Sequence, residues 1–288
     1  MGRTKQKKKR ERQDKKRRKA EREGPSLARK ADRYKLYQES VQDPESDVKL
    51  MQRIFKKRYG RPARLLREDF CGSAALACEW VSAHPDNRAW GIDLDPEPLA
   101  WAQANNLALL SPDQRERVHL IEGDVLEAQT EPADITVAYN FSYFCFQTRR
   151  DLLGYLRTAR STLREEGLLI LDAYGGADAQ QTMTETRDQE GFDYVWDQDA
   201  FDPIRHHAIN HIHFEFPDGS RIQKAFSYDW RLWTLPELCD LLEDAGFAKS
   251  EVYWEGTDAK SGEGNGVYRK AEQAPDDPAW IAYIVGVR

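Results

Sequence analysis

The sequence has no long apolar run and little cysteine chemistry. No stretch approaches the roughly 18 apolar residues of a membrane-spanning helix, and no hydrophobic region follows the charged N-terminus as a secretory signal would require. These absences predict a cytoplasmic protein without a membrane partner. The cysteines form no C-x-x-C pair, and we expect them to be buried apolar side chains in a reducing compartment. They are Cys71, Cys78, Cys145 and Cys239.

Metal-binding and phosphate-loop signatures are also missing. Four of the six histidines fall in His206–His213, and His211 and His213 would share one face of a strand. No cysteine lies nearby and the neighbouring acids complete no metal signature, so we interpret these histidines as exposed polar residues and expect no metal. The GEGNG segment (Gly262–Gly266) lacks the Lys-Ser/Thr of a phosphate loop and is expected to be a flexible turn.

Charge is distributed very unevenly along the chain. Residues 1–23 contain thirteen Lys or Arg and four acids, a net charge of +9; since the whole chain carries −6, residues 24–288 carry −15. We expect residues 1–25 to be a disordered basic tail, because the segment has almost no apolar side chains to bury. It could contact RNA, the ribosome or another polyanion, or merely solubilise the chain. The acidic remainder has no recognisable RNA-binding module and suits cationic or neutral substrates better.

A strand–turn–helix–strand unit stands out between Leu65 and Leu94. An apolar strand enters the small-residue turn Cys71–Ala75, an apolar helix follows, and a second strand ends at Asp93. A carboxylate about twenty residues beyond such a turn can accept both ribose hydroxyls of an adenosine-bearing cofactor. The unit therefore predicts a nucleoside-binding crevice.

The residues before and within the turn indicate which cofactor. Phe70 stands where a dinucleotide site has its first glycine, and the acidic pair Glu68-Asp69 would repel a pyrophosphate but suits a cationic ligand. At REDFCGSA the chain resembles the Rossmann-fold S-adenosylmethionine-dependent methyltransferases, whose first motif reads acid-x-G-x-G-x-G. Glu68 takes the acid position and Gly72 is retained, whereas Phe70 and Ala74 replace the other two glycines.

Later segments resemble the family's further motifs, in the family's order. WGIDLDPEPLAWA resembles the second, with Asp93 as the ribose acid. VHLIEGDVLE resembles the third, and there the resemblance implies that Asp124 accepts from the adenine amino group. ADITVAYNFSYFCF resembles the fourth, with Asn140 at the strand end where methyl group and acceptor would meet. The fifth strand, a late helix and a closing antiparallel strand follow, so the resemblance extends from Leu65 to the C-terminus.

Taken singly, acids after strands are often only turn or cap residues. Glu68, Asp93, Asp124 and Asn140, however, fall at four successive strand ends, where open α/β sheets bind ligands. With the resemblance, this pattern implies S-adenosylmethionine as the cofactor. The residues predicted to bind it are Glu68, Phe70, Cys71, Gly72, Asp93, Leu94, Asp124, Val125 and Asn140.

Two segments extend the minimal fold. Residues 26–60 read as two helical pieces broken at Pro44, in which Tyr34 and Tyr37 either close the site or pack on the side of the core. Residues 191–233 contain alternating strands at Ile209–Phe216 and Arg221–Tyr228, which predict an antiparallel β-lid. Its aromatic residues either shape the acceptor pocket or form plain core.

The expected architecture is an α/β doubly wound, seven-stranded methyltransferase sheet in residues 61–288, with an inserted β-lid and a helical N-terminal segment. The implied activity is methyl transfer from S-adenosylmethionine to a small-molecule acceptor. Alternatives are a ribosome- or RNA-tethered methyltransferase and a non-catalytic cofactor-binding module. The sequence assigns neither a general base nor the acceptor nor an oligomeric state. Candidates on the acceptor side are Asn140, Tyr143, Tyr174, Trp230 and Arg231, and we expect Trp230 or Arg231 to contact the acceptor.

Overall fold

The computed structural model describes residues 25–258 and 264–288, so the predicted basic tail lies almost entirely outside the described residues. Twelve strands are assigned in this part of the chain, and eight of them form the main sheet. These eight are β1 (Leu65–Asp69), β2 (Arg88–Asp93), β3 (Val118–Glu122), β4 (Ala133–Ala138), β5 (Leu163–Gly175), β10 (Lys249–Thr257), β11 (Gly264–Ala271) and β12 (Trp280–Val287). Their order across the sheet is β11-β10-β12-β5-β4-β1-β2-β3.

The first five strands run parallel to one another, and β12 and β10 are antiparallel additions. Every residue of β1 and β4 is buried between the two helical layers, including the charged Arg67, Glu68 and Asp69 of β1. The predicted α/β doubly wound sheet is confirmed. The sheet has one strand more than the predicted seven, because Gly264–Gly266 open β11 instead of forming a turn; Gly262 lies outside the described residues.

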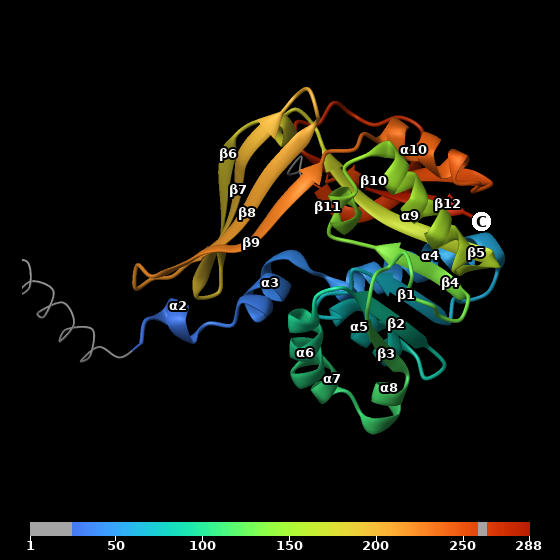
Figure 1. Cartoon of the computed structure of the whole chain (residues 1–288), viewed down its shortest axis with the longest axis horizontal. Helices are drawn as coiled ribbons and strands as arrows, with labels where there is room; N and C mark the ends of the chain where they lie inside the picture. Colours follow the sequence, from blue (N-terminus) through green and yellow to red (C-terminus); the bar gives the residue numbers. More distant parts are fainter. Residues whose placement is uncertain (1–24, 259–263) are drawn as a thin grey trace, which may run out of the picture.

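Helices cover both faces of the main sheet (Figure 1). On one face lie α4 (Pro44–Tyr59), α5 (Ala75–Ala83) and α6 (Pro96–Ala104), and on the other lie α9 (Arg149–Ser161) and α10 (Leu235–Asp244). Short helical turns complete the connections. They are α7 (Asn106–Leu109), α8 (Pro112–Glu116), η1 (Ser142–Cys145) and η2 (Asp178–Gln180). In the described chain, no helix is both long and apolar enough to cross a membrane.

The N-terminal segment is helical, with α2 (Leu27–Lys30) and α3 (Arg33–Val41) ahead of α4. The break falls at Pro44 because Asp43 caps α4, its carboxylate accepting the Ser46 N–H at 3.2 Å. Gly60, in the left-handed conformation with φ of 71°, ends the same helix.

A second, four-stranded antiparallel sheet is inserted between β5 and α10 and extends away from the main sheet (Figure 1). Its strands, in spatial order, are β6 (Met183–Gln189), β7 (Phe192–Asp202), β8 (His207–Glu215) and β9 (Arg221–Arg231). It begins eight residues before the expected Gly191, with a strand whose side chains are almost all exposed. Its apolar face packs on α3, where Leu36 lies in one cluster with Tyr194, Ile212 and Phe214.

Two expectations about side chains in these elements are wrong. His211 and His213 are buried, not exposed, because they lie between two neighbouring strands; one of these, β7, brings Asp199 and Asp197 to 3.2 Å from their Nε2 atoms. Among the cysteines, Cys71 and Cys78 are buried as expected, whereas Cys145 is exposed and Cys239 half-buried. Cys145 is exposed because it ends the short turn η1 at the sheet edge instead of lying inside a strand.

Candidate functional site

The turn after β1 keeps the backbone of a glycine-rich motif although two glycines are replaced. Phe70, Gly72 and Ala74, the three glycine positions of the motif, have φ of 59°, 50° and 53°. Residues with a side chain avoid this left-handed region at a cost of roughly 1–2 kcal/mol each. The conformation is held by backbone hydrogen bonds: the Cys71 N–H donates to the Ile92 carbonyl at 2.9 Å, and the Ala74 N–H to the Cys71 carbonyl at 2.7 Å.

Asp93, at the end of β2, is bonded directly to this turn. Its Oδ2 accepts the Gly72 N–H at 2.7 Å, and its Oδ1 accepts the Asp95 N–H at 2.9 Å. Partial burial raises the pKa of Asp93. Each carboxylate oxygen keeps a second lone pair for a further donor such as a ribose hydroxyl. A Cβ built on Gly72 would meet no chain atom within 4 Å, so the turn faces open space.

The two acids before the turn, Glu68 and Asp69, lie in different environments. Asp69 is neutralised: it accepts from Arg67 Nε at 2.7 Å and from the Tyr155 hydroxyl at 3.1 Å. Glu68, on the opposite side of β1, accepts the Ala77 N–H of α5 at 3.0 Å and forms no ion pair among the described residues. Burial raises the pKa of Glu68 to about 8. Of the two acids, only Glu68 therefore lacks a cationic partner among the described residues.

The ends of β2 and β3 lie side by side, since the Gly123 N–H donates to the Asp93 carbonyl at 2.9 Å. The exposed Asp124 accepts the Leu126 N–H at 2.9 Å, so one oxygen is held while the carboxylate remains accessible. Leu94 is 70% exposed, whereas Val125 is buried. The structure thus brings the predicted donor-binding residues to one edge of the sheet, where contact with the donor stays a prediction.

Beyond β4, two successive residues are left-handed: Asn140 and Phe141, with φ of 57° and 58°. Their N–H groups both donate to the Asp172 carboxylate, at 2.7 and 3.0 Å. Burial raises the pKa of Asp172 to about 7. Tyr143 is fully buried and its hydroxyl donates to the Asp172 carbonyl at 2.8 Å. Tyr143 therefore supports this turn from within the core, and the structure does not bring it to an acceptor.

An aromatic cluster lies beside Asn140 and joins the two sheets. Trp230 stacks on Tyr228 with ring centroids 4.2 Å apart and lies 6.1 Å from the Phe141 ring, which is itself 4.7 Å from Tyr174. The Tyr174 hydroxyl accepts from the Asn210 amide at 3.2 Å. Phe141, Tyr174 and Tyr228 are half-buried and so retain accessible surface. Three acceptor-side candidates, Asn140, Tyr174 and Trp230, are thus gathered at one place.

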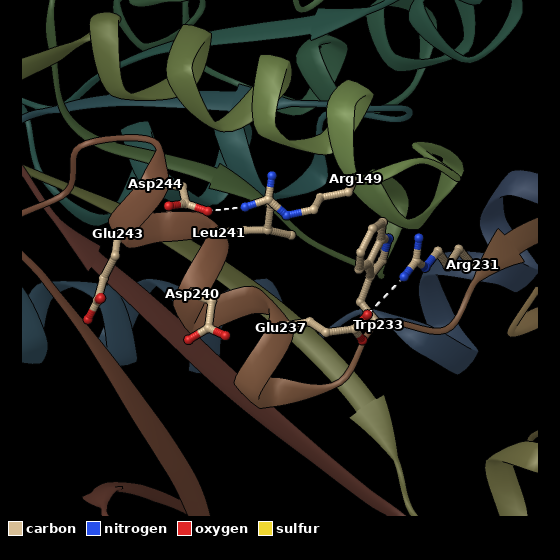
Figure 2. Close-up of a pocket in the computed structure, with 8 residues that line it drawn as sticks. All are labelled: Arg149, Arg231, Trp233, Glu237, Asp240, Leu241, Glu243 and Asp244. Carbon is tan, nitrogen blue, oxygen red and sulfur yellow. Dashed lines mark hydrogen bonds and ion pairs between the residues drawn. The ribbon is translucent and has the colours of Figure 1, made fainter.

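Arg231 is not part of this cluster, because neighbouring residues of a strand point to opposite faces. Its guanidinium lies 3.7 Å from the centre of the Trp233 ring and pairs with Glu237 at 2.8 Å, which fixes the start of α10 (Figure 2). These side chains line a cavity of about 360 Å³ that includes the Arg149–Asp244 pair. That cavity lies between α9 and α10, away from the turn after β1, so it is not the predicted cofactor site.

The helix α3 connects the second sheet to α6, the helix that follows Asp93. Arg33 pairs with Glu97 of α6 at 2.7 Å, and the Tyr34 ring lies 5.7 Å from Trp101 of the same helix. On its other side, the Tyr37 ring lies 4.9 Å from Phe226 of β9. This arrangement leaves closure of the site by Tyr34 and Tyr37 as a prediction.

No protein-family model and no curated protein matches the chain. Solved structures do match. One is an S-adenosylmethionine-dependent methyltransferase from Clostridium acetobutylicum (TM-score 0.61, 16% identity, 88% of this chain and 97% of that one). Another is the sugar N-methyltransferase KedS8 from Streptoalloteichus (TM-score 0.59, 17% identity, 92% of this chain and 95% of that one). A third is CalS10, an amino pentose methyltransferase from Micromonospora echinaspora, with S-adenosylmethionine bound (TM-score 0.59, 14% identity, 87% of this chain and 95% of that one). The chain therefore has the Rossmann-type fold of the S-adenosylmethionine-dependent methyltransferases.

Proposed function

We propose that the protein transfers a methyl group from S-adenosylmethionine to a small-molecule acceptor. The observation that carries this proposal is the turn after β1: three left-handed residues at the glycine positions, with Asp93 bonded to the central Gly72 N–H. Strained backbone of this kind persists where the surroundings enforce it, and it concentrates at functional sites. The fold shared with solved methyltransferases supports the same reading.

The proposed roles follow from the positions of the residues. Asp93 would hold the ribose hydroxyls, Asp124 the adenine amino group, and the turn from Phe70 to Gly72 would pass beside the donor. The donor brings an activated methyl group on a positively charged sulfur, so the chain needs chiefly to align the acceptor. Asn140, Tyr174 and Trp230 are the residues that we assign to that task.

The acceptor side suits a small amine, which would be attracted as a cation and would lose a proton to solvent before its nitrogen lone pair attacks the methyl group and the S–CH3 bond of the donor breaks. Aromatic faces such as those of Trp230 and Tyr228 attract cations, and among the described residues no Lys or Arg makes a cation–π contact with either ring. Two of the similar structures are a sugar N-methyltransferase and an amino pentose methyltransferase, which supports an acceptor of this size.

Replacing Asp93 with alanine tests the donor site. The change removes charge-assisted hydrogen bonds worth about 1.5–3 kcal/mol, so donor affinity should fall roughly 10- to 100-fold. Isothermal titration with S-adenosylmethionine and S-adenosylhomocysteine measures it, with the exposed Asp86→Ala as the control. Unchanged affinity would show that Asp93 does not hold the ribose. Absence of binding to the wild-type protein would instead favour a module without this cofactor.

A further inference from the structure

Arg67 is a charged residue in the middle of β1, where a buried strand would ordinarily carry an apolar side chain. Its exposed fraction is 0%, and its side chain is among the largest that the described chain buries completely. Burying a guanidinium costs free energy unless its N–H groups find acceptors, so the identity of each acceptor is informative. No sequence motif gave this residue a role.

The first acceptor is Asp69, two residues along the same strand and on the same face of the sheet. Arg67 Nε donates to Asp69 Oδ1 at 2.7 Å, and both side chains are fully buried. The other carboxylate oxygen of Asp69 accepts the Tyr155 hydroxyl of α9 at 3.1 Å. The guanidinium is therefore held by the ion pair, and the carboxylate is held in turn by α9.

The two outer nitrogens of Arg67 reach the segment that follows β3. Nη1 donates to the Ala128 carbonyl at 2.9 Å and to the Thr130 hydroxyl at 3.3 Å, and Nη2 donates to the Val125 carbonyl at 3.0 Å. The strands β1 and β3 are not neighbours, because β2 lies between them (Figure 1). One side chain thus spans the width of a strand and holds the following connection at three points.

This connection begins with Asp124, the residue proposed to meet the adenine amino group. The Asp124 carbonyl accepts the Ala128 N–H at 2.8 Å, and its carboxylate accepts the Leu126 N–H at 2.9 Å. Asp124 is therefore the first residue of the same turn whose Val125 and Ala128 carbonyls are bound by Arg67. The position of this turn above β1 decides where the free carboxylate oxygen of Asp124 lies.

We propose that Arg67 is a positioning residue that sets the preference of the donor site for adenine. This inference rests on the proposed function, in which Asp124 accepts from the adenine amino group. A carboxylate distinguishes a 6-amino base from a 6-oxo base, because the first donates a hydrogen bond and the second presents another acceptor. That distinction requires the carboxylate oxygen to be held at hydrogen-bond distance, and Arg67 holds it there through the turn.

A purely structural role of Arg67 leads to a different expectation. The loss of a structural contact lowers the stability of the fold and weakens every donor ligand by a similar factor. The loss of a positioning contact lowers the ratio between the affinities for an adenine ligand and for its 6-oxo counterpart. This ratio is therefore the quantity that separates the two roles.

Two variants and a matched control test the role. Arg67→Lys keeps a positive charge beside Asp69 but lacks the forked guanidinium that reaches the turn. Arg67→Met combined with Asp69→Leu removes the buried pair as a whole and leaves no unpaired charge, which covers the case that the first variant does not fold. The control is Arg117→Lys, since Arg117 Nη1 donates to the Val81 and His84 carbonyls, at 3.0 and 3.2 Å, before β3 begins.

Titration calorimetry with S-adenosylhomocysteine and S-inosylhomocysteine measures the ratio. The wild-type protein should prefer the adenine ligand about tenfold or more, because a hydrogen bond to a charged group is gained. Most of this preference should be lost in both Arg67 variants and kept in Arg117→Lys. Methylthioadenosine, which lacks the amino-acid end of the donor, should weaken by the same factor as S-adenosylhomocysteine, because the change affects the base.

Amide hydrogen exchange of the empty protein adds a measurement that needs no ligand. Residues 124–130 should lose protection in the Arg67 variants and keep it in Arg117→Lys. An unchanged preference or an unchanged exchange rate in the Arg67 variants would overturn the positioning role. Equal binding of both bases by the wild-type protein would also overturn it, while leaving methyl transfer from this donor as proposed. A wild-type protein that binds none of the three ligands would overturn the proposed function and this inference with it.

Discussion

Single residues carry much of the argument for a ligand at the strand ends. Phe70 and Ala74 adopt a backbone conformation that glycine enters without strain, yet both stay there with φ above 50°. Phe70 is half-buried between Phe146 and Tyr155, with ring centroids 6.1 and 5.7 Å away. This packing offsets the strain, so the turn survives the loss of two glycines.

Gly72, the glycine that the turn keeps, gives a direct test of whether the turn borders the donor. Gly72→Ala introduces a methyl group at φ of 50°, where the strain should cost roughly 1–2 kcal/mol of stability. The new Cβ meets no chain atom and would lie on the side that receives the donor. Donor affinity, measured by titration, should therefore fall about tenfold or more. Denaturant unfolding measures the loss of stability separately.

Gly154→Ala is the matched control for this prediction. Gly154 lies in the exposed interior of α9, where a Cβ also meets no chain atom but φ is ordinary. The substitution should raise stability by up to about 1 kcal/mol and leave donor affinity unchanged. If Gly72→Ala binds the donor as tightly as Gly154→Ala does, the turn does not border the ligand.

Among the elements, the strand ends and α4 together set a pH dependence. Asp47, Glu68 and Asp172 have folded-state pKa values above those of an unfolded chain, mainly because they are buried. The nearby charge of Asp43 raises the pKa of Asp47 further, and those of Asp93, Asp47 and Asp69 raise the pKa of Glu68 further. The folded state therefore holds more protons than the unfolded state between about pH 4 and pH 8.

The sign of the effect follows from this proton count. The stability of the empty protein contributed by these groups is full below about pH 4 and is lost as pH rises through their raised pKa values of about 6 to 8. A cationic ligand binds the ionised carboxylates best, so the melting-temperature increase given by S-adenosylmethionine should grow between about pH 5.5 and 8.5. The increase given by methylthioadenosine should stay nearly constant. Equal trends for both ligands would contradict this prediction.

The elements that the sequence predicted well are those whose pattern is local. The parallel strands β1 and β4 begin or centre on apolar residues that the sequence shows locally, such as Leu65 and Ile135, and capping residues such as Asp43 and Gly60 mark where α4 begins and ends. The strand β6 (MTETRDQ) has almost no apolar side chains, because an exposed edge strand needs none. No periodicity could therefore reveal it.

The same distinction between local patterns and long-range packing holds for the candidate site. Asp93 and Gly72 lie in one strand–turn–helix–strand unit, so their meeting follows from a local motif. Asp47 and Tyr283 are 236 residues apart, and only the packing of α4 against the register of β5 and β12 brings them together. Arg231 shows the converse: strand alternation turns it toward α10, where it pairs with Glu237, whereas Trp230 lies in the aromatic cluster, so of the two residues expected to contact the acceptor Trp230 is the one that stays a candidate.

For the molecule as a whole, charge separates residues 1–23, at +9, from the remaining residues, at −15. The net negative charge of the acidic part suits cations and repels a phosphate backbone. A polyanion would therefore be held by residues 1–23 and not by the site, which makes the two functions separable.

Removing residues 1–23 should leave donor affinity and melting temperature near those of the full chain, because the segment has too few apolar side chains to stabilise a core. Binding to single-stranded RNA, measured at roughly 50 and 200 mM salt, should be weak for the truncated protein and stronger and steeply salt-dependent for the full chain. A control that replaces the thirteen Lys and Arg with Gln keeps the length and should behave like the truncation. A fall of several degrees in melting temperature on truncation would show that the segment packs on the fold. Equal RNA binding by all three proteins would instead place the contact on the acidic part, against the charge argument that assigns the site a small cationic acceptor.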